Sequence, residues 1–105
     1  MEENNYVYIL RSGKSNNFKI GVAKDIGKRI KELQTGSPYV LTLYHCFTAP
    51  TRKSAFNCEN TLHKFFDQHK TELMCGEWYR ITKKELLPFL KFDTTTEILN
   101  LFQEN

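Results

Sequence analysis

The stretch FKIGVAKDIGKRIKEL, residues 18–33, changes from a strand pattern to a helix pattern within a few residues and decides how the fold begins. Its first five residues, FKIGV, have the composition of a β-strand. Asp25 is a typical helix N-cap, and Gly36, followed by Pro38, is a typical helix stop. A strand that leads directly into a short helix is therefore predicted here.

One residue of this helix fits its amphipathic pattern poorly. Ile26, Ile30 and Leu33 fall on one apolar stripe at about 100° per residue, and Arg29 falls beside that stripe. An arginine at this position can cover apolar surface with its stem while its head reaches water. It can also be held there to face a ligand, and the helix alone leaves both readings open.

Two further strand patterns accompany the first. YVYIL, residues 6–10, alternates so that Tyr6, Tyr8 and Leu10 share one face. The connecting residues SGKSNN are typical of a turn, so this strand and FKIGV are expected to form a hairpin. Residues 40–48 predict a third strand.

A second helix is expected over residues 52–69, and it also carries a charge at the margin of its apolar stripe. Glu59 lies on that border, one turn before His63. A carboxylate withdrawn from water needs a positive or hydrogen-bonding partner. Glu59 and Arg29 could pair with each other, or they could flank a phosphate and a metal ion. The stripe itself consists of Ala55, Cys58, Leu62, Phe65 and Phe66.

Two capping boxes predict where the last helices begin. Thr82 with Glu85, and Thr94 with Glu97, each place a hydroxyl three residues before a glutamate. The two helices should occupy about residues 83–103.

These elements give the order β-β-α-β-α-β-α-α, with the last strand expected within residues 75–82. A chain of this length suits one domain with one modest core. We therefore expect a single α/β (α+β) domain over residues 1–105, built on a central antiparallel three-stranded sheet flanked by helices. Its core should span about residues 6–81.

The positive charge of the chain is concentrated in one segment. Residues 11–31 contain seven basic residues and one acidic residue, which gives +6, while the whole chain carries +3. Such a field suits a polyanion such as DNA, although a solvated hairpin and helix would carry the same charge. The residues expected to contact nucleic acid are Lys14, Lys24, Lys28 and Lys31.

The cysteines indicate an intracellular protein, cytoplasmic or nuclear. Their number, three, is odd, and the acidic, polar N-terminus is not an export signal, so reduced thiols are expected. No apolar run is long enough to span a membrane. Zinc is disfavoured because the order Cys58, His63, His69, Cys75 matches no common zinc-finger spacing.

Five short elements, taken together in chain order, carry a resemblance to a known family. They are YVY (6–8), KIG (19–21), Arg29, Glu59 and GEWY (76–79). This ordered set resembles the GIY-YIG endonuclease superfamily, in the short phage and bacterial branch whose second motif reads KIG. The two charges that amphipathicity left unexplained fall at the positions of the family's arginine and metal-binding glutamate.

The resemblance implies a metal-dependent endonuclease that hydrolyses DNA phosphodiester bonds by water attack. Its catalytic residues would be Tyr8, Lys19, Arg29 and Glu59. Glu59 would hold one Mg²⁺ (or Mn²⁺) ion, and Arg29 would bind the nonbridging oxygens. Either Tyr8 or Lys19 would be the base that activates water. Strong sequence specificity would require a homodimer or a partner protein.

Two departures from the family pattern qualify this mechanism. Lys19 stands where longer-studied members have a tyrosine, and Leu33 stands where many have a histidine. A nucleic-acid-binding module that has lost catalysis is therefore the alternative. Supporting roles fall to Tyr6, Gly21 and His63; His63 could orient Glu59, contact phosphate or cap the edge of the core.

Overall fold

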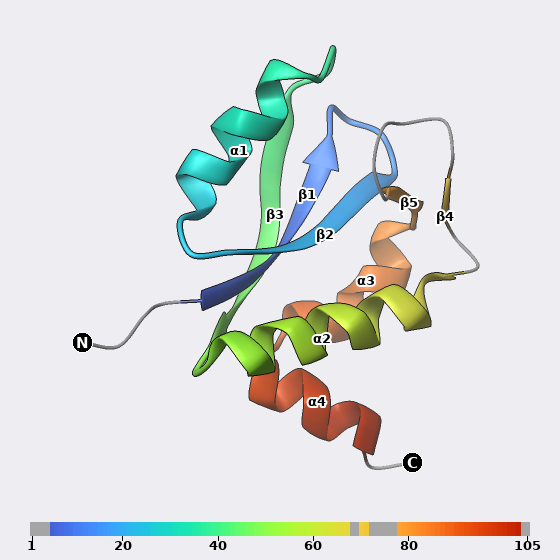
Figure 1. Cartoon of the computed structure of the whole chain (residues 1–105). Coiled ribbons are helices and arrows are strands. Elements are labelled where there is room, and N and C mark those ends of the chain that lie inside the picture. The colour runs from blue at the N-terminus through green and yellow to red at the C-terminus, as the bar shows by residue number, and fades with distance from the viewer. Residues whose placement is uncertain (1–4, 68–69, 72–77, 104–105) are drawn as a thin grey trace.

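A long β-hairpin forms the centre of the molecule. The computed structural model describes residues 5–67, 70–71 and 78–103 (Figure 1). β1 (Asn5–Ser12) and β2 (Asn17–Ala23) pair antiparallel, as the strand patterns predict. Arg11 closes the turn between them, because its Nε and Nη2 atoms each donate to a backbone carbonyl of the turn at 2.8 Å.

Within the described residues the sheet has five strands in the order β3-β1-β2-β5-β4, so the predicted three-stranded sheet is wrong. β3 (Leu41–Ala49) pairs antiparallel with β1. On the other side of the hairpin, β5 (Trp78–Arg80) pairs with the first half of β2, and β4 (Lys70–Thr71) pairs with β5. Both added strands are too short to show an alternation of their own, and only their pairing places them in the sheet.

In the part of the chain that the structure describes, four helices pack around this sheet: α1 (Ile26–Thr35), α2 (Arg52–Phe65), α3 (Lys83–Leu90) and α4 (Thr95–Gln103). Asp25 caps α1, and Thr82 forms the predicted capping box of α3. α2 ends at Phe65 rather than continuing to residue 69, because the backbone of Phe66 leaves the helical conformation. None of the helices in the described ranges is long and apolar enough to cross a membrane.

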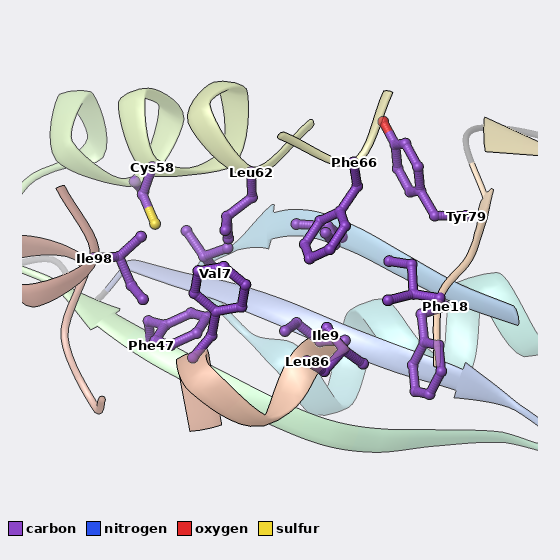
Figure 2. Packing of buried hydrophobic residues seen from close by; sticks show 14 of the residues in the cluster. Val7, Ile9, Phe18, Phe47, Cys58, Leu62, Phe66, Tyr79, Leu86 and Ile98 are labelled. Atoms are coloured by element: carbon purple, nitrogen blue, oxygen red, sulfur yellow. The ribbon is translucent and has the colours of Figure 1, made fainter. Parts of the chain in front are cut away.

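The main core lies between one face of the sheet and helices α2, α3 and α4. In Figure 2, Cys58 and Leu62 point from α2 toward the sheet residues Val7 and Ile9. Phe65 was predicted to share this stripe, but it remains 49% exposed. It packs edge-on against the core rings of Phe66 and Phe89 and against the partly buried ring of Phe102.

The opposite face of the sheet carries Tyr8, Lys19 and Gly21 and is covered more thinly. α1 lies apart from the other three helices, across the strands (Figure 1). It has no fully buried residue, and Leu33 of its apolar stripe is half-buried. On this face Tyr8 is nonetheless buried and Lys19 is half-buried.

Candidate active site

A pocket of about 200 Å³ opens where β2 passes between α1 and α2. The four residues predicted to be catalytic all line it, and each comes from a different element: Tyr8 from β1, Lys19 from β2, Arg29 from α1 and Glu59 from α2. The structure thus brings these four side chains together, while their roles stay predictions. The other lining residues are Ile20, Gly21, Val22, Phe56 and His63.

Gly21 allows the Tyr8 ring to reach this pocket. The two residues face each other across the β1–β2 pair, with their side chains on the same face of the sheet. A Cβ atom placed on Gly21 would collide with the hydroxyl and Cζ of Tyr8. The Tyr8 ring therefore lies over the backbone of β2, in space that any other residue would fill, and is only 2% exposed.

Arg29 contacts two partners at the mouth of the pocket. A hydrogen bond to Tyr8 is the largest cause that raises the pKa of Arg29, and Glu32 adds to it. The Nη1 atom of Arg29 lies 3.3 Å from Oε2 of Glu32, one turn along α1. Arg29 and Glu59 were considered either as a mutual ion pair or as residues that flank a phosphate and a metal ion. Among the described residues, the ion pair of Arg29 is with Glu32 and not with Glu59. The Arg29 side chain remains 44% exposed, so part of the guanidinium faces the pocket solvent.

Lys19 extends along the sheet from the next register position. Its backbone pairs with Trp78 of β5, and its Nζ lies 5.9 Å from the centroid of the Trp78 ring. Trp78 is 5% exposed, so it supports the lysine from below as a fixed surface. This contact holds a second positive charge at the same pocket as Arg29.

His63 joins α2 to the sheet through both ring nitrogens. Nε2 lies 3.0 Å from the carbonyl oxygen of Ile20, which must be the acceptor, so Nε2 carries the proton. Nδ1 lies 2.6 Å from the hydroxyl of Tyr79 and accepts a hydrogen bond from it in that tautomer. β5 pairs with β2 as far as Lys19, and Ile20 is the next residue of β2. His63 therefore makes the hydrogen bond to the Ile20 carbonyl that a neighbouring strand would otherwise make. These contacts lie at the edge of the core, and the roles considered for His63 toward Glu59 and toward a phosphate stay predictions.

Glu59 sits one turn before His63, with its Oε2 atom 3.9 Å from the Nε2 atom of His63. Its side chain is 22% exposed, which agrees with a position on the border of the α2 stripe. A larger hollow of about 550 Å³ lies on the other side of this pair, so Glu59 and His63 line both pockets. Of the described residues, Asn60, Lys64, Asp67 and Tyr79 also line the larger hollow.

The other predicted residues lie outside both pockets. Tyr6 is half-buried in β1, and its neighbours in the sheet are Ala23 and Thr48. The four lysines expected to bind nucleic acid are exposed, and none of them is among the lining residues: Lys14, Lys24, Lys28 and Lys31. His69, Cys75 and the first two residues of GEWY lie outside the described residues.

The donor set of the pocket fits one magnesium-like ion better than a protein-enclosed metal. In the described ranges, no three histidine, cysteine, aspartate or glutamate side chains are grouped to hold an ion. Mg²⁺ is usually held by one or two carboxylates, several waters and the phosphates of its substrate. A single partly exposed carboxylate, Glu59, is compatible with that arrangement.

Tyr79 and Phe56 are among the residues of the site that were not predicted from the sequence. Tyr79 was noted only as part of GEWY, and nothing local indicates that its hydroxyl meets His63 from another element. Phe56 did carry a signal, since a phenylalanine off the apolar stripe of an amphipathic helix is expected to be exposed. It is 40% exposed at the pocket.

The family of the chain follows from a match to a family model, the T5orf172 domain, over residues 5–92. Because that match covers most of the chain, the protein belongs to the T5orf172 domain family. This finding corrects the resemblance to the GIY-YIG superfamily, whose short motifs named a different family. The T5orf172 domain is nuclease-like, which fits a DNA-acting endonuclease in general. No curated protein and no solved structure gives a match.

Proposed function

We propose that this domain hydrolyses DNA phosphodiester bonds at the pocket between α1 and α2, with the help of one Mg²⁺ or Mn²⁺ ion. The observation that carries the proposal is the meeting of Tyr8, Lys19, Arg29 and Glu59, from four separate elements, around one pocket of about 200 Å³. A phenol, two cations and a carboxylate at one small pocket suit the cleavage of a charged phosphate. The nuclease-like family supports the same reading.

Arg29 and Lys19 would bind the phosphate. A guanidinium carries five N–H donors in a planar fork that matches phosphate oxygens, and Tyr8 and Glu32 use only part of that set. Negative charge grows on the nonbridging oxygens during in-line attack, so donors fixed in advance stabilise the transition state. Removal of such a donor typically lowers the rate about 10²–10³-fold.

Tyr8 and Lys19 are the two candidates for orienting and deprotonating the attacking water. An interaction with Tyr8 is the largest cause that raises the pKa of Arg29, and a phenol hydroxyl has a proton to donate to a water or a phosphate oxygen. Lys19 lies at the same pocket, above the ring of Trp78. Both groups lie at the pocket that would hold the phosphate. Substitution of Tyr8 and of Lys19, one at a time, would distinguish which of them activates the water.

Glu59 would hold the metal ion, because it is the carboxylate among the described lining residues of the smaller pocket. A bound divalent ion would neutralise charge on the phosphate and on the leaving oxygen. The bond from Nε2 of His63 to the Ile20 carbonyl fixes α2 against β2 and thereby sets the distance of Glu59 from the sheet residues of the site.

The decisive experiment is cleavage of supercoiled plasmid DNA by the parent and by Glu59→Gln, in magnesium, in manganese and in chelator. We expect the parent to nick the plasmid only with a metal, and Glu59→Gln to bind DNA without cutting it. Asp93→Asn is the matched control, because it removes one carboxylate from an exposed residue that lines neither pocket.

Melting in chelator shows whether Glu59 is a structural residue instead. Removal of half of a buried ion pair costs about 3–5 kcal/mol, whereas loss of the contacts of a partly exposed carboxylate such as Glu59 costs about 1 kcal/mol. We expect the smaller value. Near-parental cleavage by Glu59→Gln would refute the assignment, and DNA binding by a parent that never cuts would identify a binding module.

A further inference from the structure

Phe56 remains partly in water at the edge of the candidate active site. Its side chain is 40% exposed, although the buried stripe residues Ala55 and Cys58 lie on either side of it in the sequence of α2. The guanidinium carbon of Arg52 lies over its ring, 5.4 Å from the centroid. The ring also lines the pocket of Arg29 and Glu59, so a ligand there would touch it.

Phe56 belongs to a row of functional side chains along one face of α2. Arg52, Phe56, Glu59 and His63 follow each other at spacings of four, three and four residues, which keeps them on one side of a helix. From Arg52 to His63 the row extends about 16 Å along the helix. Successive nucleotides of a duplex strand are about 3.4 Å apart, so the row is long enough to lie beside several nucleotides. The larger hollow continues beyond Glu59 and His63, toward Lys64.

We propose that this row guides an unpaired segment of the DNA strand, and that Phe56 stacks on the base next to the phosphate to be cleaved. The inference rests on the proposed function and specifies its substrate class: DNA with unpaired nucleotides at the cleavage site, such as a flap, a gap or a single strand. Arg52 contributes a positive charge for the backbone at one end of the row.

The physical reason is the accessibility of base faces. Inside a duplex, each base is covered by its stacked neighbours, so an aromatic side chain beside a backbone phosphate has no base face to contact. In a single strand the faces are open, and an exposed aromatic ring beside a positively charged groove is the usual stacking platform. The narrow pocket favours the same substrate, since the Tyr8 ring at its floor is 2% exposed and a phosphate must enter deeply to reach it.

The test measures binding in chelator, so that no cleavage is required. The probes are a short single-stranded DNA with 2-aminopurine at a central position, whose fluorescence falls on stacking, and the blunt duplex of the same sequence. We expect tighter binding of the single strand, with quenching. Phe56→Ala and Phe56→Leu should each weaken it about five- to hundredfold and abolish the quenching, while Phe56→Trp retains both.

Phe56→Leu is the informative variant, because it keeps apolar volume and removes the aromatic face. Leu87→Ala is the control, since Leu87 is 64% exposed on α3 and lines neither pocket. Parental affinity and quenching in Phe56→Leu would overturn the inference, as would equal losses for single strand and duplex. A ring-dependent single-strand complex without cleavage in metal would sustain the inference while the proposed hydrolysis fails. A parent that binds neither probe would overturn both.

Discussion

Replacement of Gly21 by alanine tests the geometry on which the site depends. The added methyl group would collide with the hydroxyl and Cζ of Tyr8 and would lie 3.0 Å from Cε1. The Tyr8 ring is only 2% exposed, so neighbouring atoms enclose it and it has no open solvent beside it to move into. We expect the ring to be displaced and its hydrogen bond with Arg29 to break.

The magnitude follows from overpacking of a close-packed site. Insertion of a methyl group into such a site costs about 1–3 kcal/mol. For a domain of 105 residues each kcal/mol corresponds to about 4 °C in melting temperature, so a decrease of about 4–12 °C is expected. A displacement of the Tyr8 hydroxyl by about 1 Å should lower plasmid cleavage about 10²-fold.

Gly27→Ala is the matched control, because it makes the same chemical change in α1. The nearest atom to its added methyl group would be Oδ1 of Asp25, at 3.6 Å, an ordinary contact. Alanine is a better helix former than glycine by up to about 1 kcal/mol, so this variant should melt up to about 4 °C higher. Thermal unfolding followed by circular dichroism and plasmid nicking measure both effects.

The Tyr8→Phe background shows whether the collision is the cause. Without the hydroxyl one of the two collisions of the new methyl group is gone while the collision with Cζ remains, so Gly21→Ala should cost somewhat less stability there than in the parent. A Gly21→Ala protein that melts and cleaves like the parent would refute the placement of the Tyr8 ring over β2.

Three further predictions concern the basic segment, the edge of the core and the buried thiol. Replacement of both Lys14 and Lys24 by glutamine should weaken DNA binding most at low salt and reduce its salt slope by about 0.9 for each phosphate that is no longer neutralised; unchanged low-salt affinity would move the binding surface elsewhere. Tyr79→Phe should cost about 0.5–1.5 kcal/mol, because Nδ1 of His63 loses its donor, and an unchanged urea midpoint would contradict that bond. Burial, with a smaller effect of Glu59, raises the pKa of Cys58 from 9.0 to about 12, so stability present below pH 9 should fall by up to about 1.4 kcal/mol per unit toward pH 12. Cys58→Ala should lack this alkaline loss, and a parallel decline of both proteins in melts at increasing pH would count against it.

The sequence predicted much of the candidate site because two of its members break a local pattern. Arg29 and Glu59 each lie on the margin of an apolar stripe, and the structure places both at one pocket. Phe56 breaks the same pattern and was not among the predicted residues. Tyr79 breaks no pattern, because a tyrosine in a short strand is ordinary until its hydroxyl is found beside His63.

The family shows a different limit. The tripeptides YVY and KIG are common in strands, and their order along the chain indicated one superfamily. The family model that spans residues 5–92 identifies a different family, the T5orf172 domain. Short motifs sample few positions, and a match along most of the chain samples the spacing and character of nearly all of them.

The sequence by itself determined the features that have a local cause. The hairpin faces follow from a period of two, the helices from a period near 3.6, and their starts from hydroxyl and carboxylate caps such as Asp25 and Thr82. What only the tertiary structure decided is which groups meet across elements. β5 pairs with β2, Arg29 contacts Glu32 and Tyr8, and His63 forms a hydrogen bond with the Ile20 carbonyl at the edge of β2. Those choices depend on distances between segments far apart in the chain, and no periodicity within a segment encodes them.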